Sequence, residues 1–242
     1  MSKVDLRVDW CSYEAAKYAV MHWHYSKTMP AGKLLKIGAW EDGEFIGCVI
    51  FGRGAIYHIG DPYGLEQTEC CELVRVALRQ HSTPTSRIVS IAIGMVKRQS
   101  PQLRLLVSYA DSKEGHLGIL YQATNWVYVG GTSAPWIRVR EELRHPRSVN
   151  AQYGTWSLGW IQEHIDPESE LVPMPPKYKY LYPLDRAMRR QIEPLAQPYP
   201  KRAGEAKTAN APGDQPGNRG FESHPPAPET VQPPQPPPTG DG

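Results

Sequence analysis

The sequence predicts an α/β fold, with a mixed central sheet and helices on both of its faces. Stretches with the apolar spacing of helices alternate with short apolar runs that are typical of buried strands. The pair Asp42-Gly43 separates the first two of these runs, as in a β-hairpin. The chain has 242 residues, of which 40% are hydrophobic, and this is enough to enclose a core.

The first predicted helix covers residues 13–22, and Ser12 can act as its N-cap. The hairpin follows within residues 36–54. The remaining predicted elements are a strand over 70–78, a helix over 86–98, a strand over 103–111, a short helix over 116–126 and a strand over 127–132. A hairpin followed by strand, helix, strand, helix and strand resembles the GNAT acyltransferase fold.

The C-terminal part differs in composition from the rest of the chain. From about Pro198 proline, glycine and polar residues dominate, so the segment cannot bury enough apolar surface to offset its loss of entropy. We therefore expect one domain over residues 1–197 and a disordered, Pro/Gly-rich tail over 198–242.

Composition also bears on the class of protein. The net charge of +2 is small, so contact with nucleic acid would require a local basic patch. The N-terminal residues lack the apolar core of a signal peptide, and no run of about 18 apolar residues indicates a membrane span. We expect a cytoplasmic protein without membrane contact.

Two charged residues stand at unusual places in predicted strands. Asp111 directly follows a buried strand, and the carboxyl ends of strands are where open α/β sheets bind ligands; the alternative is a turn or N-cap aspartate. Arg75 lies within a buried strand, where alternation would place Leu73, Arg75 and Ala77 on one face. Since a buried arginine needs a partner, we expect Arg75 to point into a polar cleft and bind phosphate or carboxylate.

The loop QHSTPTSR precedes the second predicted helix. Thr85, Ser86 and Arg87 can offer hydrogen-bond donors to a phosphate at the N-terminus of this helix, which is where GNAT enzymes hold the pyrophosphate of coenzyme A. The Gly-x-Gly signature usual in that family is absent, and ordinary helix capping is the alternative.

A region of mixed basic and aromatic residues covers positions 136–190. Cations bind phosphates and aromatic faces stack on bases, so this region is a candidate DNA-binding surface. The alternative is a solvated face next to a tyrosine-rich strand, KYKYLY, at a sheet edge. The candidate DNA-binding residues are Arg144, Arg147, Lys177, Lys179 and Trp126, and Trp23, Tyr109 and Trp136 are further candidates for stacking on a base.

The stretch HWHYSKTMP contains a candidate metal or catalytic cluster. In a helix His22 and His24 would point roughly 200° apart and could not share one ion. The helical spacing ends near His22 and Pro30 follows, so His24 and Tyr25 are expected in a loop that faces a cleft, with Asp111 as their distant partner.

An ordered set of motifs resembles the Mom DNA-modification proteins of Mu-like phages. The motifs are HYSKTMP, ELVRVAL, TSRIVSIAI, SYADSKEGHLGILYQATNW followed by GGT, HPRSV, YGT and KYKYLYPL. They span roughly residues 20–190. The resemblance implies a GNAT-like catalytic domain that adds a carbamoylmethyl (acetamido-type) group to adenine N6 in double-stranded DNA, which shields phage DNA from host restriction.

The resemblance also implies roles for particular residues. It implies iron bound by His24, Tyr25 and Asp111, and importance of Arg75, Ser86 and Tyr121 for activity, with Tyr121 as a general acid by analogy with GNAT enzymes. The implied partners are double-stranded DNA and a small-molecule donor, either acetyl-CoA or a related acyl or glycyl compound. Whether the protein acts as a homodimer stays open. The alternative functions are a GNAT N-acetyltransferase for a small-molecule or protein amine, and a non-enzymatic DNA-binding accessory protein.

Overall fold

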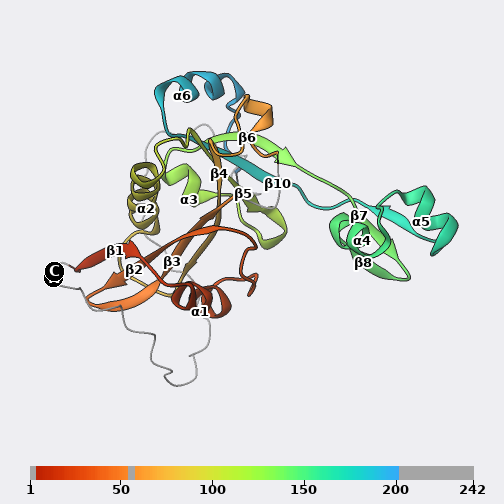
Figure 1. Ribbon diagram of the computed structural model, residues 1–242, viewed down its shortest axis with the longest axis horizontal. Coiled ribbons are helices and arrows are strands. Elements are labelled where there is room, and N and C mark those ends of the chain that lie inside the picture. Colours follow the sequence, from red (N-terminus) through yellow and green to blue (C-terminus); the bar gives the residue numbers. More distant parts are fainter. Residues whose placement is uncertain (1–3, 54–57, 202–242) are drawn as a thin grey trace, which may run out of the picture.

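A mixed seven-stranded sheet forms the centre of the molecule, in a computed structural model that describes residues 4–53 and 58–201 (Figure 1). The strand order is β1-β2-β3-β4-β5-β10-β6, and only β4 and β5 pair in parallel. The strands are β1 (Leu6–Trp10), β2 (Leu34–Glu41), β3 (Glu44–Gly52), β4 (Cys70–Leu78), β5 (Leu105–Asp111), β6 (Val127–Thr132) and β10 (Lys177–Pro183).

Helices cover both faces of this sheet. They are α1 (Tyr13–Trp23), α2 (Thr85–Gln99), α3 (Ile119–Ala123) and α6 (Arg186–Ile192), with short 3-10 turns η1 (Asp61–Tyr63), η2 (Ser112–Glu114) and η3 (Glu193–Leu195). The α1 helix packs on β3 and β4, whereas α2 packs on the opposite face together with Leu106 and Leu73. The predicted fold class, a mixed sheet with helices on both faces, is confirmed.

Local signals of the sequence are confirmed at the N-terminal end. The Ser12 hydroxyl accepts a hydrogen bond from the Ala15 N–H at 3.1 Å, which satisfies one of the free donors at the start of α1. Asp42 and Gly43 both have positive φ, 49° and 84°, as a two-residue hairpin turn between β2 and β3 requires.

The position of the KYKYLY strand differs from the alternative considered above. This strand, β10, is not at a sheet edge but lies between β5 and β6, antiparallel to both. Tyr180 and Leu181 are fully buried, one on each face. Aromatic and aliphatic side chains on both faces of the strand explain why it occupies an interior place.

The parallel strands β4 and β5 separate after a short contact. They pair only at Cys70–Leu105, Cys71–Leu106 and Glu72–Val107, and beyond this point the sheet opens.

A bulge in β4 accompanies this opening. The register with β3 shifts between Leu73 and Arg75, so that Val74 is the extra residue. The expectation that Leu73, Arg75 and Ala77 share one face was therefore wrong. Leu73 packs on the α2 face and Ala77 on the α1 face, because the extra residue reverses the alternation.

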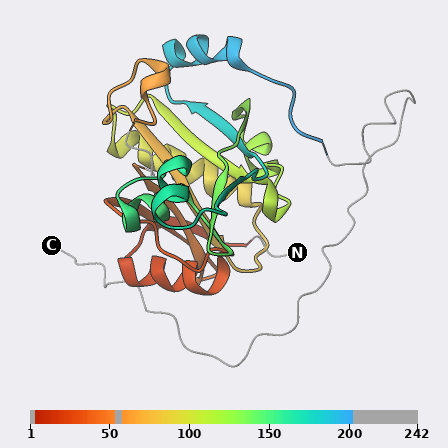
Figure 2. The ribbon, with the colours of Figure 1, turned by 90° about the vertical axis from the view of Figure 1, so that its right-hand side faces the viewer.

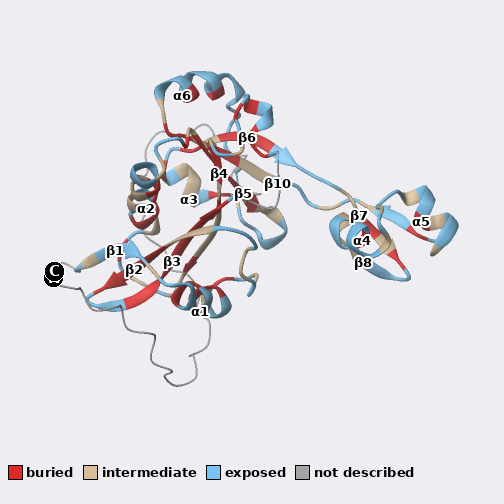
Figure 3. Cartoon of the chain, in the orientation of Figure 1, coloured by how far each residue is buried: buried red, intermediate tan, exposed pale blue. Residues whose placement is uncertain are grey.

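Residues 133–176 form an arm that leaves the sheet after β6 and returns at β10 (Figure 1). The arm contains a small sheet with order β8-β7-β9 and two helices: β7 (Trp136–Val139), β8 (Glu142–Arg144), α4 (Pro146–Tyr153), α5 (Leu158–His164) and β9 (Glu170–Val172). Its own core consists of Ile137, Val139, Val149 and Ile161, all of them buried (Figure 3). In Figure 2 the arm lies in front of the main sheet.

Residues on both sides of the predicted boundary at residue 197 bond to the main sheet. The Gln197 N–H donates to Tyr128 O at 2.8 Å, and the Tyr199 hydroxyl donates to Trp126 O at 2.6 Å, so residues past 197 still attach to the sheet. The rest of the predicted tail, 202–242, lies outside the described residues. No helix among the residues that the structure describes is long and apolar enough to cross a membrane.

Candidate functional site

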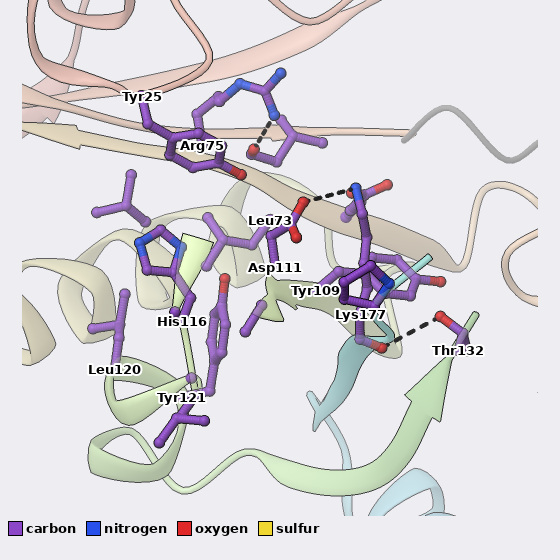
Figure 4. A pocket seen from close by; sticks show the side chains of 18 of the residues that line it. Tyr25, Leu73, Arg75, Tyr109, Asp111, His116, Leu120, Tyr121, Thr132 and Lys177 are labelled. Carbon is purple, nitrogen blue, oxygen red and sulfur yellow. Dashed lines mark hydrogen bonds and ion pairs between the residues drawn. The ribbon is translucent and has the colours of Figure 1, made fainter. Parts of the chain in front are cut away.

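A cavity of about 1020 Å³ occupies the opening between β4 and β5. Its walls include the end of α1, the loop and short helix after β5, and residues of the arm. Ten residues singled out from the sequence line it, although they come from distant parts of the chain: Trp23, His24, Tyr25, Arg75, Tyr109, Asp111, Tyr121, Trp136, Arg147 and Lys177. Figure 4 shows Tyr25 and Tyr121 approaching the same space from opposite sides.

His24 ends α1 and is buried, with 8% of its surface exposed. The backbone N–H of Ser26 donates to His24 Nδ1 at 3.1 Å, so the proton of the neutral ring is on Nε2. Burial and, to a smaller extent, the nearby charge of Arg75 together lower the pKa of His24 to about 4. His24 is therefore a neutral imidazole at neutral pH.

Tyr25 connects this histidine to the other wall of the cavity. Its ring lies 4.3 Å from the His24 ring and 5.3 Å, edge-on, from the His116 ring (centroid distances). Burial raises the pKa of Tyr25, and the charge of Asp111 adds to the effect, so the phenol stays protonated at neutral pH.

Arg75 points into the cavity, as expected. Its Nη1 donates to Val74 O at 2.7 Å and its Nη2 to Thr28 O at 3.5 Å, while its buried Nε has no hydrogen-bond partner among the described residues. A guanidinium held by carbonyls and facing a cavity can bind an anionic or carbonyl oxygen of a ligand.

Asp111 caps a short helix, one of the two roles considered for it, and it also lines the cavity. Its Oδ1 accepts from the Lys113 N–H at 3.0 Å and so caps η2, while its Oδ2 lies 3.3 Å from Lys177 Nζ. The ion pair is drawn in Figure 4. Asp111 on β5 lies opposite Lys177 on β10, and both residues line the cavity, so the ion pair is part of the cavity wall.

Tyr121 is tied to the sheet by a serine. The Ser108 hydroxyl lies 2.8 Å from Leu73 O and 2.7 Å from the Tyr121 hydroxyl. A carbonyl only accepts, so when Ser108 donates to Leu73 the Tyr121 hydroxyl donates to Ser108. Burial raises the pKa of Tyr121 to about 12, which keeps this hydroxyl protonated.

The predicted phosphate site at α2 does not join the cavity. Thr85, Ser86 and Arg87 do not line it. In the preceding loop, Glu41 accepts hydrogen bonds from the backbone N–H groups of Ser82 at 2.9 Å and Thr83 at 2.6 Å.

The Glu41 carboxylate accepts the hydrogen bonds that a bound phosphate would otherwise accept at this loop. Pro84, which follows Thr83, has no N–H, and the Arg87 N–H bonds to Pro84 O. Residues arranged in this way do not fit the diphosphate of coenzyme A, because two of the donors that it would need are already bound to Glu41. We therefore derive no step through a coenzyme A bound at α2.

The candidate DNA-binding residues separate into two groups. Arg147 and Lys177 line the cavity. Arg144 instead pairs with Glu142, and Lys179 lies half-buried 5.0 Å above the Tyr63 ring. Trp126 is fully buried against Tyr121 and Tyr182, so its assignment to base stacking was wrong in this structure.

The implied iron ligands do not form a metal site as they stand. His24 Nδ1 already accepts a hydrogen bond and Nε2 carries the proton, both oxygens of Asp111 have partners, and Tyr25 is a neutral phenol. Within residues 4–53 and 58–201 no three His, Cys, Asp or Glu side chains are placed to hold an ion. No step of the chemistry below is therefore assigned to iron.

Two cavity residues were missed by the sequence analysis, His116 and Glu72. His116 lies between Gly115 and Gly118, which both have positive φ, and a polar residue in such a loop after a strand end was a usable signal. Glu72 had the same signal as Arg75, a charged residue within an apolar strand, but alternation assigned it to the other face.

Comparisons with known proteins agree with the resemblance noted in the sequence. Residues 5–201 match the model of the Mom protein family. The chain belongs to this family. A relative, the Methylcarbamoylase mom of Escherichia phage Mu, is 24% identical over 204 residues, which cover 81% of this chain and 84% of the relative.

Solved structures with similar folds were also found. A putative acetyltransferase from Acinetobacter baylyi ADP1 has a TM-score of 0.44 and 14% identity, covering 76% of this chain and 95% of its own. FeeM, an N-acyl amino acid synthase from uncultured soil microbes, has a TM-score of 0.40 and 11% identity, covering 78% of this chain and 94% of its own.

Proposed function

We propose that this protein is a DNA-modification enzyme that attaches a carbamoylmethyl (acetamido-type) group to N6 of adenine in double-stranded DNA. The observation that carries the proposal is the convergence of Tyr25, Arg75, Asp111 and Tyr121 in one cavity, in a chain of the Mom family. The modification would protect phage DNA from host restriction enzymes.

The cavity suits an extruded base together with a small donor. Its volume of about 1020 Å³ is at the upper end of ligand pockets. Three of its wall residues, Trp23, Tyr109 and Trp136, are aromatic and can stack on a base. Arg147 and Lys177 add positive charge to the same walls, which favours the phosphate next to that base.

In the proposed reaction the N6 nitrogen attacks an activated carbon of the donor. One N–H bond breaks and one N–C bond forms, and the bond from the donor carbon to its leaving group breaks with its electron pair. The leaving group takes a proton from the Tyr121 hydroxyl, which is free to donate when the Ser108 hydroxyl donates to Tyr121 instead of to Leu73 O. Arg75 binds the carboxamide oxygen of the donor and so positions the adjoining methylene carbon for attack, and Asp111 with Lys177 fixes the wall beside it.

The donor class follows from the same residues. Glu41 already accepts hydrogen bonds from the N–H groups of Ser82 and Thr83, so a donor anchored by a diphosphate at α2 does not fit. A donor that lies in the cavity next to the base does fit. A compact acyl or glycyl compound with a leaving group meets this requirement.

The proposal is tested by expressing the protein with a plasmid and digesting the plasmid DNA to nucleosides. We expect a new adenosine species that co-elutes with synthetic N6-carbamoylmethyl-deoxyadenosine and not with its methylcarbamoyl isomer, which has the same mass and must be separated by fragmentation. A cell extract without the protein is the control. Unmodified adenosine despite good expression would contradict the proposal, and acetylation of added small amines instead would favour an N-acetyltransferase.

A further inference from the structure

Glu72 is a carboxylate at the floor of the cavity. It occupies the last position at which β4 and β5 pair, opposite Val107, and beyond it the strands separate. Its side chain lines the opening that results. Partial burial of a charged side chain costs folding free energy, which the charges of Arg75, Lys177 and Arg147 offset in part.

Glu72 differs from the other acidic residue of the cavity. Asp111 is engaged by Lys177 and by the Lys113 N–H. For the Glu72 carboxyl, the described residues provide neither a hydrogen bond nor an ion pair within contact distance. Glu72 is half-buried and lines the cavity, so a ligand there that donates an N–H or O–H can bind its carboxylate.

The electrostatic surroundings of Glu72 suit a proton acceptor. Burial raises the pKa of Glu72, while the charges of Arg75, Lys177 and Arg147, which all line the same cavity, lower it. Burial is the largest of these effects, so the Glu72 carboxylate is a better proton acceptor than the carboxylate of an exposed glutamate.

The position of Glu72 also fits the geometry of transfer. It acts on Tyr121 and Tyr109, since its charge raises the pKa of both phenols. Tyr121 is the assigned acid for the leaving group and Tyr109 is a candidate platform for the base. Glu72, Tyr109 and Tyr121 all line the cavity, so an amine of a ligand bound there can contact the Glu72 carboxylate.

We propose that Glu72 binds the exocyclic amine of the extruded adenine and takes its proton as the N–C bond forms. This inference rests on the proposed function and deepens it, because it names the base of that reaction. The N–H electron pair stays on nitrogen and forms the bond to the donor carbon, the proton moves to the Glu72 carboxylate, and the leaving group is protonated by Tyr121.

Two measurements on variants of Glu72 test the proposal, with Glu72→Asp as the conservative variant and Glu66→Gln, an exposed glutamate, as the matched control. The first is DNA modification. Glu72→Gln should lose roughly 10²-fold or more in turnover, Glu72→Asp should retain part of it, and Glu66→Gln should equal the wild type. Melting curves of all variants check that they are folded.

The second measurement is binding and does not require turnover. Short duplexes carry either adenine or purine, which lacks the amine, opposite an abasic site, so that extrusion costs little in both. The wild type should bind the adenine duplex roughly tenfold more tightly than the purine duplex, as expected for one hydrogen bond to a charged group. Glu72→Leu, whose side chain has no acceptor, should bind both equally.

The two outcomes separate the two proposals. If the wild type modifies DNA and Glu72→Gln does so equally well, or Glu72→Leu still prefers adenine to purine, the role of Glu72 is wrong while the function stands. If the wild type modifies no DNA but prefers adenine in a Glu72-dependent way, the function is wrong and the amine-binding role of Glu72 stands. If neither activity nor preference is seen, both are overturned.

Discussion

Lys177 Nζ lies 3.3 Å from Asp111 Oδ2, and the two residues are direct partners in the register of β10 and β5. The pair joins the two strands that flank the cavity on one side. Because the lysine side chain is 57% exposed, the pair should contribute little to stability, about 0–1 kcal/mol. We expect the ion pair to matter because it fixes the position of the Asp111 carboxylate.

We predict that Asp111→Ala abolishes DNA modification and leaves the protein folded. The loss should be roughly 10²-fold or more, because the variant removes a fixed charge from the reaction site. Nucleoside analysis measures the activity and thermal unfolding measures the fold. Glu114→Ala, next to the site on η2, is the control. Wild-type activity in Asp111→Ala would remove this residue from the mechanism.

The buried histidine predicts how stability depends on pH. The pKa of His24 falls from an ordinary 6.5 to about 4 on folding, so the unfolded chain binds more protons between these values. Its contribution to the free energy of unfolding is therefore complete above about pH 6.5 and is lost as the pH falls toward 4. The loss should be roughly 3 kcal/mol.

Urea unfolding at several pH values measures this dependence. In His24→Asn, which cannot be protonated, the dependence between pH 4 and 6.5 should become shallower by this amount, and His22→Asn, an exposed histidine, is the control. Parallel curves for wild type and His24→Asn would show that the imidazole is not held neutral.

Truncations test the C-terminal boundary. A chain that ends at Lys201 should keep the activity and melting temperature of the full chain, because residues 202–242 are rich in proline and poor in apolar residues. A chain that ends at Leu195 loses the bonds of Gln197 and Tyr199 to the sheet and should be less stable by about 1–3 kcal/mol. Equal stability of the two truncations would place the boundary before residue 196.

The bonds of Glu41 predict how coenzyme A behaves. Added coenzyme A should leave the amide NMR signals of Ser82 and Thr83 in place, because Glu41 already accepts from both N–H groups. Glu41→Gln, which can accept with one oxygen only, should release one of these amides, and Glu44→Gln on the same hairpin is the control. Saturable shifts of both amides in the wild type would show that a diphosphate displaces Glu41.

The sequence was sufficient to predict the elements whose signals are local. The α1 cap at Ser12 and the Asp42-Gly43 turn depend on neighbours in the chain, and both were predicted correctly. The place of β10 was not predictable in the same way, because its partners β5 and β6 are separated from it by the arm.

The candidate site shows the same distinction. Asp111 and Arg75 could be identified because a charged residue at a strand end or inside a buried strand is unusual and indicates a ligand or a charged partner. The bulge at Val74 is not visible in the pattern, and it decides which side chains of β4 share a face. Trp126 was assigned to DNA because tryptophans are common in binding sites, and only the packing of Tyr121 and Tyr182 around it shows that it is a core residue.

The arm begins and ends at residues that are partners in one sheet, since Thr132 of β6 pairs with Lys177 of β10. It also has a core of its own, and its four arginines are outnumbered by six acidic residues (4 − 6 = −2). An insert closed in this way can change in length, charge or shape without shifting the register of the strands that carry Asp111 and Lys177. Changes in the arm can therefore alter which molecules reach the cavity, while the residues on the sheet that carry the chemistry stay in place.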